Sequence, residues 1–347
     1  MKAQVLTGIG MMEMREVADP VIKHDKDVLL KINKVGVCGS DVHYYETGRI
    51  GSQIVNYPYI VGHECCATVV EVGPAVTRVK PGDAIVVDPA AWCDECDQCR
   101  MGRENTCRNL SFLGTPGQAS GCLTEYIVMP EKSCFPTHNA ITLDQAVLCE
   151  PFAIGVYAVK GSPAAPGAKI AILGSGPIGL SCLAAAKAKG IDTIYMTDRI
   201  DQRLAVATAA GATWTGNPDR ENIVEAIDSS EPTGIDVVYE CAGQQETLNQ
   251  AVELLRPGGT LMIIGIPRTE QVSFSIDRLR RKEITVINVR RQNRCTQEAI
   301  DLIASGKASV DFMITHRFPF DRSAEAFELV AGYRDGVVKA LIEVADA

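Results

Sequence analysis

The sequence predicts two domains, one rich in β-strands and one built on a doubly wound parallel sheet. Its 347 residues exceed what one hydrophobic core usually serves. Between about residues 25 and 135, short apolar runs alternate with Gly, Pro and Asp, which is typical of strands and loops. After about residue 155, strand-length apolar runs alternate with helix-length segments, which indicates parallel strands with crossover helices. We therefore expect two domains with a cleft between them.

The predicted elements follow from this change of pattern. In the first region, strands are expected at VLLKINKVGV, CCATVVEVG and DAIVVDPA. In the second, about six strands are expected, among them KIAILG, TIYMTD, IDVVYEC, TLMIIG and ITVINV, with helices at 180–189, 201–210 and 245–255. The tail from about residue 295 has helical segments at 296–305 and 323–331 and a last strand, VVKALIEV. Periodicity alone does not assign this tail to either domain.

Composition and charge limit the kinds of partner. Hydrophobic residues make up 46% of the chain and charged residues 22%, which indicates a globular protein. The net charge of −9 argues against a nucleic-acid surface, because phosphate binding needs clustered Lys and Arg. No apolar run reaches the length of a membrane span, and no secretory signal is evident. We expect a cytoplasmic protein with a small-molecule partner.

A glycine motif between KIAILG and the next predicted helix indicates a dinucleotide site. Gly174 permits a tight turn, Gly176 lets the backbone approach a pyrophosphate, and Gly179 allows close packing of helix on strand. The motif reads Gly174, Ser175, Gly176, Pro177, Ile178 and Gly179. A glycine turn that binds no nucleotide is the alternative.

Asp198 strengthens the dinucleotide hypothesis and favours NAD. It ends the next predicted strand, where a carboxylate can accept hydrogen bonds from an adenosine ribose diol. The same carboxylate would repel the 2′-phosphate of NADP. Arg199 and Arg203 lie nearby and keep NADP open as an alternative.

Four closely spaced cysteines predict a structural metal site. Cys93, Cys96, Cys99 and Cys107 form a C-x2-C-x2-C-x7-C pattern among 13 cysteines in the chain. Four thiolates in one short loop suit tetrahedral zinc. An iron–sulfur cluster and a disulfide framework are the alternatives.

A second set of metal-ligand types is scattered along the chain. It comprises Cys38 in VGVCGSDVH, His63 and Glu64 in VGHE, and Glu150 in CEPFAIG. Each residue alone has an ordinary explanation, because a single Cys is often a small buried hydrophobe and a single His is often structural.

Taken together, these segments resemble the zinc-dependent medium-chain dehydrogenases, most closely the polyol (sorbitol) dehydrogenases. The resemblance rests on VGVCGSDVHYYETGRIG, VGHE, VKPGD, the four-cysteine loop, CEPFAIGVYAV, GSGPIGL, TD, RPGGTL, THRFPF and KALIEV. It implies a GroES-like β-rich catalytic domain, residues 1–155 and 295–347, interrupted by a Rossmann doubly wound domain, residues 156–294. It also implies about two zinc ions per chain, NAD and a homotetramer.

The resemblance assigns metal ligands residue by residue. Cys38 and His63 look like the first two ligands of a catalytic zinc, and Glu64 like the glutamate that ligates the zinc or orients its water. Glu150 takes the place of a third, cysteine ligand in related alcohol dehydrogenases. Cys149 competes for that role, but we favour Glu150 because the resemblance lies in its Glu-Pro pair and neighbouring residues of a strand point in opposite directions.

The resemblance also implies a hydride transfer. Zinc as a Lewis acid would favour the substrate alkoxide, which passes a hydride to the nicotinamide. Ser40 and His43 match the serine and histidine that relatives use to carry the proton away, with a turn residue and a surface imidazole as the alternatives.

Substrate contacts are predicted at Tyr44, Phe112, Thr115 and Arg290, which could equally be core aromatics and a solvated arginine. Polyol dehydrogenases typically follow that arginine with an aromatic residue, whereas this chain has Arg291 and then Arg294. Such a cluster could pair with a carboxylate or phosphate or lie on a surface turn.

The leading hypothesis is therefore NAD-dependent oxidation of a secondary hydroxyl of a polyol (sorbitol-, xylitol- or iditol-like) to a ketose. The same chemistry on a sugar acid or sugar phosphate comes second. A catalytically silent, zinc-stabilised nucleotide-binding protein and a zinc-free quinone reductase are disfavoured because Cys38, His63, Glu64 and Glu150 are all present.

Overall fold

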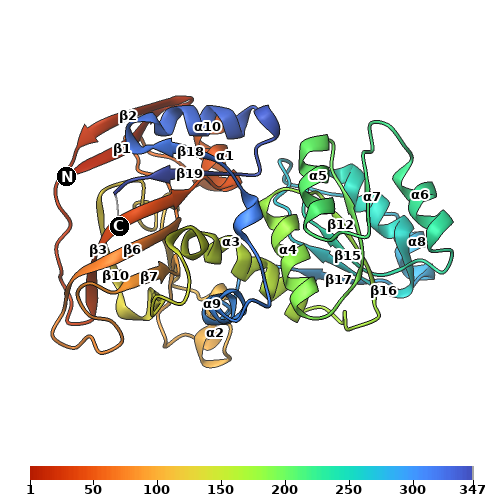
Figure 1. Ribbon diagram of the computed structural model, residues 1–347, viewed down its shortest axis with the longest axis horizontal. Coiled ribbons are helices and arrows are strands. Elements are labelled where there is room, and N and C mark those ends of the chain that lie inside the picture. The colour runs from red at the N-terminus through yellow and green to blue at the C-terminus, as the bar shows by residue number, and fades with distance from the viewer. Residues whose placement is uncertain (346–347) are drawn as a thin grey trace. The chain divides into compact units, whose positions relative to one another are not determined.

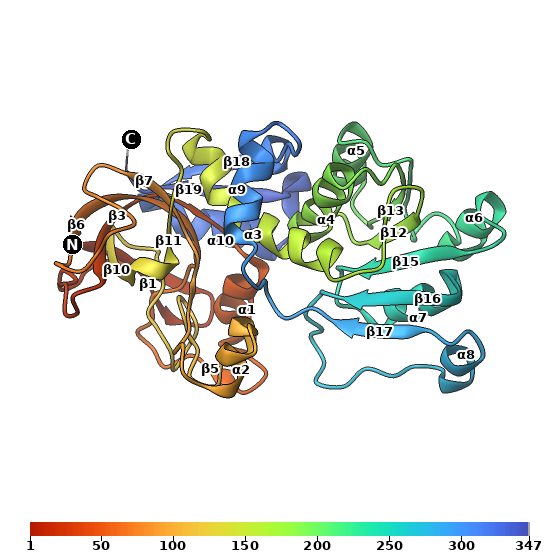
Figure 2. The same cartoon turned by 90° about the horizontal axis from the view of Figure 1, so that it is seen from below.

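The computed structural model describes residues 1–345 and divides into two compact units. Unit 1 comprises Met1–Glu150 together with the chain from Ile314 onward, and unit 2 is Pro151–Met313. Each unit has its own sheet and its own hydrophobic core (Figures 1 and 2). Within the described residues, no helix has both the length and the hydropathy needed to cross a membrane.

Unit 1 is built on a seven-stranded sheet in the order β11-β7-β6-β3-β19-β18, with β10 also paired to β3. The strands are β3 (Asp27–Gly36), β6 (Glu64–Val72), β7 (Ala84–Val87), β10 (Tyr126–Pro130), β11 (Cys134–Pro136), β18 (Ile314–Pro319) and β19 (Lys339–Glu343). The last strand, β19, runs antiparallel to β3 and pairs Leu341 with Gly36. From Ile314 onward, the tail that periodicity could not place therefore completes the first sheet, whereas its first helix, α9 (Thr296–Ala304), lies in unit 2.

Shorter elements surround this sheet. They are β1 (Lys2–Gly8), β2 (Met11–Glu16), β4 (Arg49–Ile50), β5 (Gln53–Ile54), β8 (Ala90–Ala91), β9 (Ser111–Phe112), α1 (Gly39–Thr47), α2 (Asp97–Arg100) and α10 (Ser323–Ala331). The 3-10 turns are η1 (Glu104–Thr106), η2 (Glu131–Ser133), η3 (Asp311–Met313), η4 (Phe320–Arg322) and η5 (Arg334–Gly336).

The expectation of strands and loops throughout residues 25–135 was wrong at α1. Its buried residues Asp41, Val42, Tyr44 and Tyr45 follow helical spacing over little more than one turn. The helix ends at Gly48, which takes a left-handed conformation with φ 69°. A nine-residue helix with mostly polar residues gives little periodicity, so the sequence pattern did not reveal it.

Unit 2 contains a six-stranded, all-parallel sheet in the order β14-β13-β12-β15-β16-β17. Its strands are β12 (Lys169–Leu173), β13 (Thr193–Thr197), β14 (Trp214–Gly216), β15 (Ile235–Glu240), β16 (Leu255–Ile263) and β17 (Thr285–Asn288). Its helices are α4 (Pro177–Ala188), α5 (Asp201–Ala209), α6 (Ile223–Ser230), α7 (Gln245–Leu254), α8 (Ile276–Arg281) and α9 (Thr296–Ala304). The order reverses after β12, which makes the sheet doubly wound, as predicted.

Helix α3 (Leu143–Lys160) carries the chain from one unit into the other. Its first turn is tied to unit 1 because Asp144 accepts hydrogen bonds from Lys34 Nζ at 2.7 Å and from Arg317 Nη1 at 3.0 Å. Pro151 lies inside the helix, where it lacks the N–H of a regular helical hydrogen bond. The division between the units falls immediately before this proline.

Candidate metal centres and dinucleotide site

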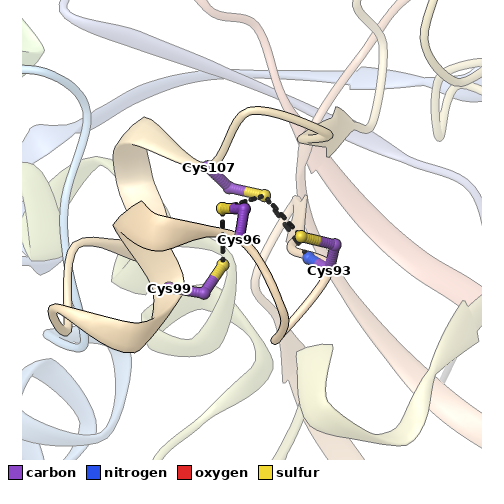
Figure 3. Close-up of side chains that lie close together, drawn as sticks. All are labelled: Cys93, Cys96, Cys99 and Cys107. Carbon is purple, nitrogen blue, oxygen red and sulfur yellow. Dashed lines mark hydrogen bonds between the residues drawn. The ribbon is translucent and has the colours of Figure 1, made fainter.

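The four-cysteine loop brings its sulfurs together, with α2 and η1 supplying the turns between them (Figure 3). Neighbouring sulfurs lie 3.6 Å apart for Cys96 and Cys99, 3.9 Å for Cys96 and Cys107, and 3.5 Å for Cys107 and Cys93. A tetrahedron with Zn–S bonds of about 2.3 Å has edges of about 3.8 Å. The four sulfurs therefore fit one tetrahedral zinc ion, and they are far beyond the S–S distance of a disulfide.

Backbone amides prepare this loop for a cation. Hydrogen bonds from the backbone of Arg108 and Cys99 lower the pKa of Cys96 to about 6. The pKa of Cys93 is also lowered, first by the backbone of Glu95. Zinc binds the thiolate form, so both shifts favour metal binding, whereas burial raises the pKa of Cys99 to about 12 and acts against it.

The second cluster joins Cys38, His63 and Glu64, whose ligand atoms lie within 4.8 Å of one another. Cys38 caps the N-terminus of α1, and Glu64 opens β6 directly after His63. His63 and Glu64 are buried, and Cys38 is partly exposed. Sulfur, imidazole nitrogen and carboxylate oxygen are the donors that zinc takes in catalytic sites.

Asp41, which the sequence analysis missed, fixes the histidine. Its Oδ1 lies 3.2 Å from Nδ1 of His63 and accepts a hydrogen bond from Gly62 N at 3.2 Å. Burial lowers the pKa of His63, whereas the charges of Asp41 and Cys38 raise it. The pKa therefore stands well above its usual range. A carboxylate on one ring nitrogen leaves the other nitrogen for a metal. The signal in the sequence is the spacing Cys38-x2-Asp41, which places Asp41 in the first turn of α1 after the N-cap Cys38.

Lys339 is a second residue that sequence reasoning did not single out. Its ammonium donates to Glu64 Oε1 at 2.8 Å, to Oε2 at 2.6 Å and to the carbonyl of Val37 at 3.1 Å. Both side chains are almost fully buried. The signal is a lysine at the start of β19, within the apolar run VVKALI, because a charged group is buried only with a partner.

Glu150 is buried beside the same cluster. Burial raises the pKa of its carboxyl to about 7, with the charge of His63 acting against this shift and that of Glu64 adding to it. Cys149 and Glu150 both lie in α3, so the expectation that they point in opposite directions along a strand was wrong. Cys149 nevertheless has its own partner, because its thiol donates to the carbonyl of Gln145 at 3.3 Å.

The predicted proton-transfer and substrate residues are only partly brought to this cluster. Ser40 Oγ donates to Cys38 Sγ at 3.2 Å, and the Phe112 ring lies 5.5 Å from the His63 ring. His43 is half-buried in α1. Tyr44 is buried, and its hydroxyl donates to Gln53 at 3.0 Å.

The other predicted substrate residues are placed by their own segments. Thr115 is buried, and its backbone forms a bridge to Ala119. Arg290 is exposed and Arg291 half-buried in the segment after β17. Arg291 has a positive φ of 54°, a backbone conformation that residues other than glycine seldom adopt.

In unit 2, the glycine motif forms the turn between β12 and α4. Gly174 has φ 105°, and a Cβ atom on Gly179 would lie 1.8 Å from the carbonyl oxygen of Gly174. Helix α4 begins at Pro177, with Ile178 following in its first turn and Gly176 as its N-cap. The helix N-terminus and the close approach of strand to helix are what a bound pyrophosphate requires.

The acidic and basic residues near the motif take different positions. Asp198 accepts hydrogen bonds from Ser175 N at 2.8 Å and from Ile200 N at 2.9 Å, so its carboxylate lies on the glycine turn. Arg203 is buried, and its Nη1 lies 3.5 Å from where a Cβ atom on Gly176 would be. Arg199 donates to Asp219 at 3.0 Å in an exposed pair.

These features define a protein with a zinc-type catalytic unit and a dinucleotide-binding unit, and the comparisons with known proteins agree. Residues 24–139 match the alcohol dehydrogenase GroES-like domain, and residues 177–305 match the zinc-binding dehydrogenase domain. Sorbitol dehydrogenase of Bacillus subtilis (strain 168) is 34% identical over 99% of this chain and 97% of its own. L-idonate 5-dehydrogenase of Vitis vinifera is 35% identical over 88% of this chain and 85% of its own.

A solved structure from Sinorhizobium meliloti 1021, described as a zinc-binding dehydrogenase bound to NADP, has a TM-score of 0.91 and 33% identity, covering 99% of each chain. An alcohol dehydrogenase from Escherichia coli CFT073, solved with NADH, has a TM-score of 0.89 and 26% identity, covering 99% of each chain. The chain belongs to the zinc-containing medium-chain dehydrogenase family. Zinc and NAD(P) are the typical cofactors of this family.

The two cysteine-containing clusters should respond differently to mutation. We expect about two zinc ions per chain. Cys99→Ser removes one of the four sulfur ligands, so it should weaken zinc binding and with it the stability of the fold. The thermal midpoint should fall by roughly 5–10 °C, where ~1 kcal/mol corresponds to 2–4 °C in a domain of this size. Cys38→Ser should abolish turnover and keep the fold. Elemental analysis, thermal unfolding and turnover check this, and the reverse pattern would contradict the assignment of the two sites.

Lys339 should stabilise the unit by pairing with Glu64. Lys339→Met leaves a buried carboxylate without its cation and should cost about 3–5 kcal/mol in the free energy of unfolding of metal-free protein. Lys339→Arg keeps the charge and serves as the matched control. Denaturant unfolding gives the free energy of unfolding of both variants. If Lys339→Met and Lys339→Arg are equally stable, the charge of Lys339 does not stabilise the unit.

Glu150 should make the stability of metal-free protein fall as pH rises. Its folded pKa of about 7 stands above the ordinary value of 4.5, so folded protein keeps a proton that unfolded protein releases. The stabilisation is full below about pH 4.5 and is lost through pH 7, on the order of 2–3 kcal/mol. Glu150→Gln should make this slope shallower, whereas the exposed Glu225→Gln should leave it as it is in the parent protein. Denaturant unfolding at several pH values tests it, and a slope unchanged in Glu150→Gln would contradict it.

Proposed function

We propose that the protein oxidises a secondary hydroxyl of a polyol to a ketone, with NAD as hydride acceptor. The cluster of Cys38, His63 and Glu64, with Glu150 buried beside it, is the observation that carries this proposal. Three protein ligands with a neighbouring carboxylate describe a catalytic zinc site, which keeps a position for water or substrate. The cysteine tetrad, by contrast, supplies four sulfurs and leaves no such position.

The roles of the residues follow from their contacts. Cys38, His63 and a carboxylate from Glu64 or Glu150 would hold the zinc, which when bound supplies the Lewis acidity that favours an alkoxide. Asp41 keeps the His63 ring in one orientation. Lys339 offsets the charge of Glu64.

Proton transfer is proposed for Ser40 and His43. Ser40 Oγ is already beside the metal cluster, within 3.2 Å of Cys38 Sγ, so a small rotation of its hydroxyl side chain would bring it to a substrate oxygen. His43 lies three residues further along α1 and is half-buried, so it would pass the proton toward solvent.

The cofactor is proposed to be NAD. The carboxylate of Asp198 lies on the glycine turn, where it can also accept hydrogen bonds from ribose hydroxyls and would repel a 2′-phosphate. Arg199 is paired with Asp219. Arg203, at the glycine turn, is the residue that favours a phosphate and keeps NADP in second place.

A neutral polyol is the proposed substrate. Relatives named sorbitol dehydrogenase and D-xylulose reductase act on uncharged polyols and ketoses, and they align with nearly the whole chain. The second candidate is a sugar acid or sugar phosphate. It is favoured by a relative named L-idonate 5-dehydrogenase and by Arg291, next to Arg290.

Cofactor choice tests the role of Asp198. The parent enzyme should have a higher kcat/KM with NAD than with NADP, and Asp198→Ala should lower the NAD-to-NADP ratio by roughly tenfold or more. Asp192→Ala, which removes an exposed carboxylate paired with Lys187 before β13, should leave the ratio unchanged. Equal use of both cofactors by the parent enzyme would contradict the proposal.

The substrate is tested by NAD reduction with polyols, hexonates and sugar phosphates. We expect neutral polyols to give the highest kcat/KM, with little change in Arg291→Ala. If Arg290 and Arg291 bind an anionic group of the substrate, Arg291→Ala should raise KM for hexonates or sugar phosphates by roughly ten- to a hundredfold. An anion preference that disappears in Arg291→Ala would overturn the choice of substrate and keep the hydride chemistry. A protein that oxidises none of these compounds would contradict the proposed function itself.

A further inference from the structure

A buried glutamate ends the strand next to the glycine turn. Glu240, the last residue of β15, is 0% exposed. Its Oε1 accepts hydrogen bonds from Ala242 N at 2.9 Å, Gly243 N at 2.7 Å and Thr247 Oγ1 at 2.7 Å. Its Oε2 is buried and has no hydrogen-bond partner among the described residues. One carboxylate oxygen thus holds the loop after β15 and the first turn of α7.

This arrangement is costly for folding alone. Burial raises the pKa of Glu240, and the hydrogen bonds from Thr247 and the backbone only partly oppose the shift. Glu231, another buried glutamate of unit 2, lies at the end of α6, is paired with the ammonium of Lys169 and accepts a hydrogen bond from the Tyr195 hydroxyl at 2.8 Å. Buried acids are ordinarily compensated as Glu231 is, by a cationic side chain. Glu240 instead receives backbone amides, which indicates that loop position is what it provides.

The loop that Glu240 holds is in contact with the glycine turn. A Cβ atom on Gly174 would lie 3.1 Å from Ala242 N, the amide that donates to Glu240. Gly174 already has φ 105°, so its conformation and its contact both depend on the absence of a side chain. The turn after β12 therefore rests directly on the backbone after β15.

The turn after β16 meets the same loop from the other side. A Cβ atom on Gly265 would lie 2.3 Å from Gly243 N and 2.8 Å from Glu240 Oε2. The turns after β12, β15 and β16 are thus stacked at the carboxyl end of three adjacent parallel strands. In doubly wound sheets this end binds the dinucleotide.

We propose that Glu240 is a positioning residue for the dinucleotide: it fixes the backbone at Ala242 and Gly243 and thereby the two glycine turns that this backbone supports. The proposal rests on the dinucleotide site of the proposed function. It assigns Glu240 no contact with the cofactor and no part in proton or hydride transfer. Loss of the carboxylate would release two backbone amides and let all three turns shift together.

The test compares two buried glutamates of unit 2, Glu240 at the end of β15 and Glu231 at the end of α6. Glu240→Ala removes the acceptor at the carboxyl end, and Glu231→Ala removes an acceptor near Lys169, which opens β12 at the amino end. Glu240→Gln keeps an acceptor oxygen, and Thr247→Val removes one donor without changing shape. Isothermal titration with NAD gives Kd for each full-length protein, while thermal unfolding and zinc content report the fold and the metal sites.

Glu240→Ala should raise Kd for NAD roughly tenfold or more, because two amides lose their acceptor. Glu240→Gln should stay within about threefold of the parent protein, and Thr247→Val should fall between them. Glu231→Ala should lower the thermal midpoint and leave Kd unchanged. Zinc content should be the same in all four.

Three results would overturn the proposal. The first is an unchanged Kd for NAD in Glu240→Ala. The second is a rise of Kd in Glu231→Ala equal to that in Glu240→Ala. The third is a Glu240→Gln variant that binds NAD as weakly as Glu240→Ala. If Glu240→Ala does not fold, Thr247→Val with an unchanged Kd would overturn it. Parent protein that binds neither NAD nor NADP would overturn the proposed function and this inference together. Parent protein that binds NAD with no effect of Glu240 overturns only the inference.

Discussion

Unit 1 depends on how it neutralises buried negative charge. Asp41, Glu64 and Glu150 are buried around Cys38 and His63, and an isolated buried carboxylate costs several kcal/mol. Lys339 offsets Glu64 through two short hydrogen bonds. His63 lies against Asp41, and the pKa of Glu150 is raised. A divalent cation among these donors would complete the charge balance, and binding it would then stabilise the folded unit.

The same ion pair explains why the fold needs its last strand. Lys339 opens β19 and Glu64 opens β6, and the two residues are 275 positions apart in sequence. Strand β19 pairs with β3, which also pairs with β6, so the sheet places the ammonium beside the carboxylate. Unit 2 lies between these segments in the sequence. The tail therefore contributes the ammonium that pairs with Glu64, in addition to two strands of the sheet.

Local patterns were enough to predict much of the fold and of the site. The glycine turn and the cysteine tetrad consist of residues close in sequence, so their motifs predicted them. The parallel strands contain apolar runs, which predicted the strands of unit 2. Contacts across long sequence separations could not be predicted in this way. Asp41 faces His63 across 22 positions, and Lys339 faces Glu64 across 275 positions. Glu240 ends a strand of mostly apolar residues, and its burial is known only from the structure. The helical position of Glu150 was missed because an apolar run of α3 resembles a buried strand.

Zinc X-ray absorption tests the central claim, which is that one chain holds a closed sulfur site and a second, mixed site. The parent protein should show a sulfur shell at about 2.3 Å together with a nitrogen and oxygen shell at about 2.0–2.1 Å. Cys38→Ala should lower the sulfur contribution of the mixed site and keep the four-sulfur shell. A parent spectrum with sulfur alone would contradict the account, because it would leave Cys38, His63 and the buried carboxylates without the metal that their arrangement requires.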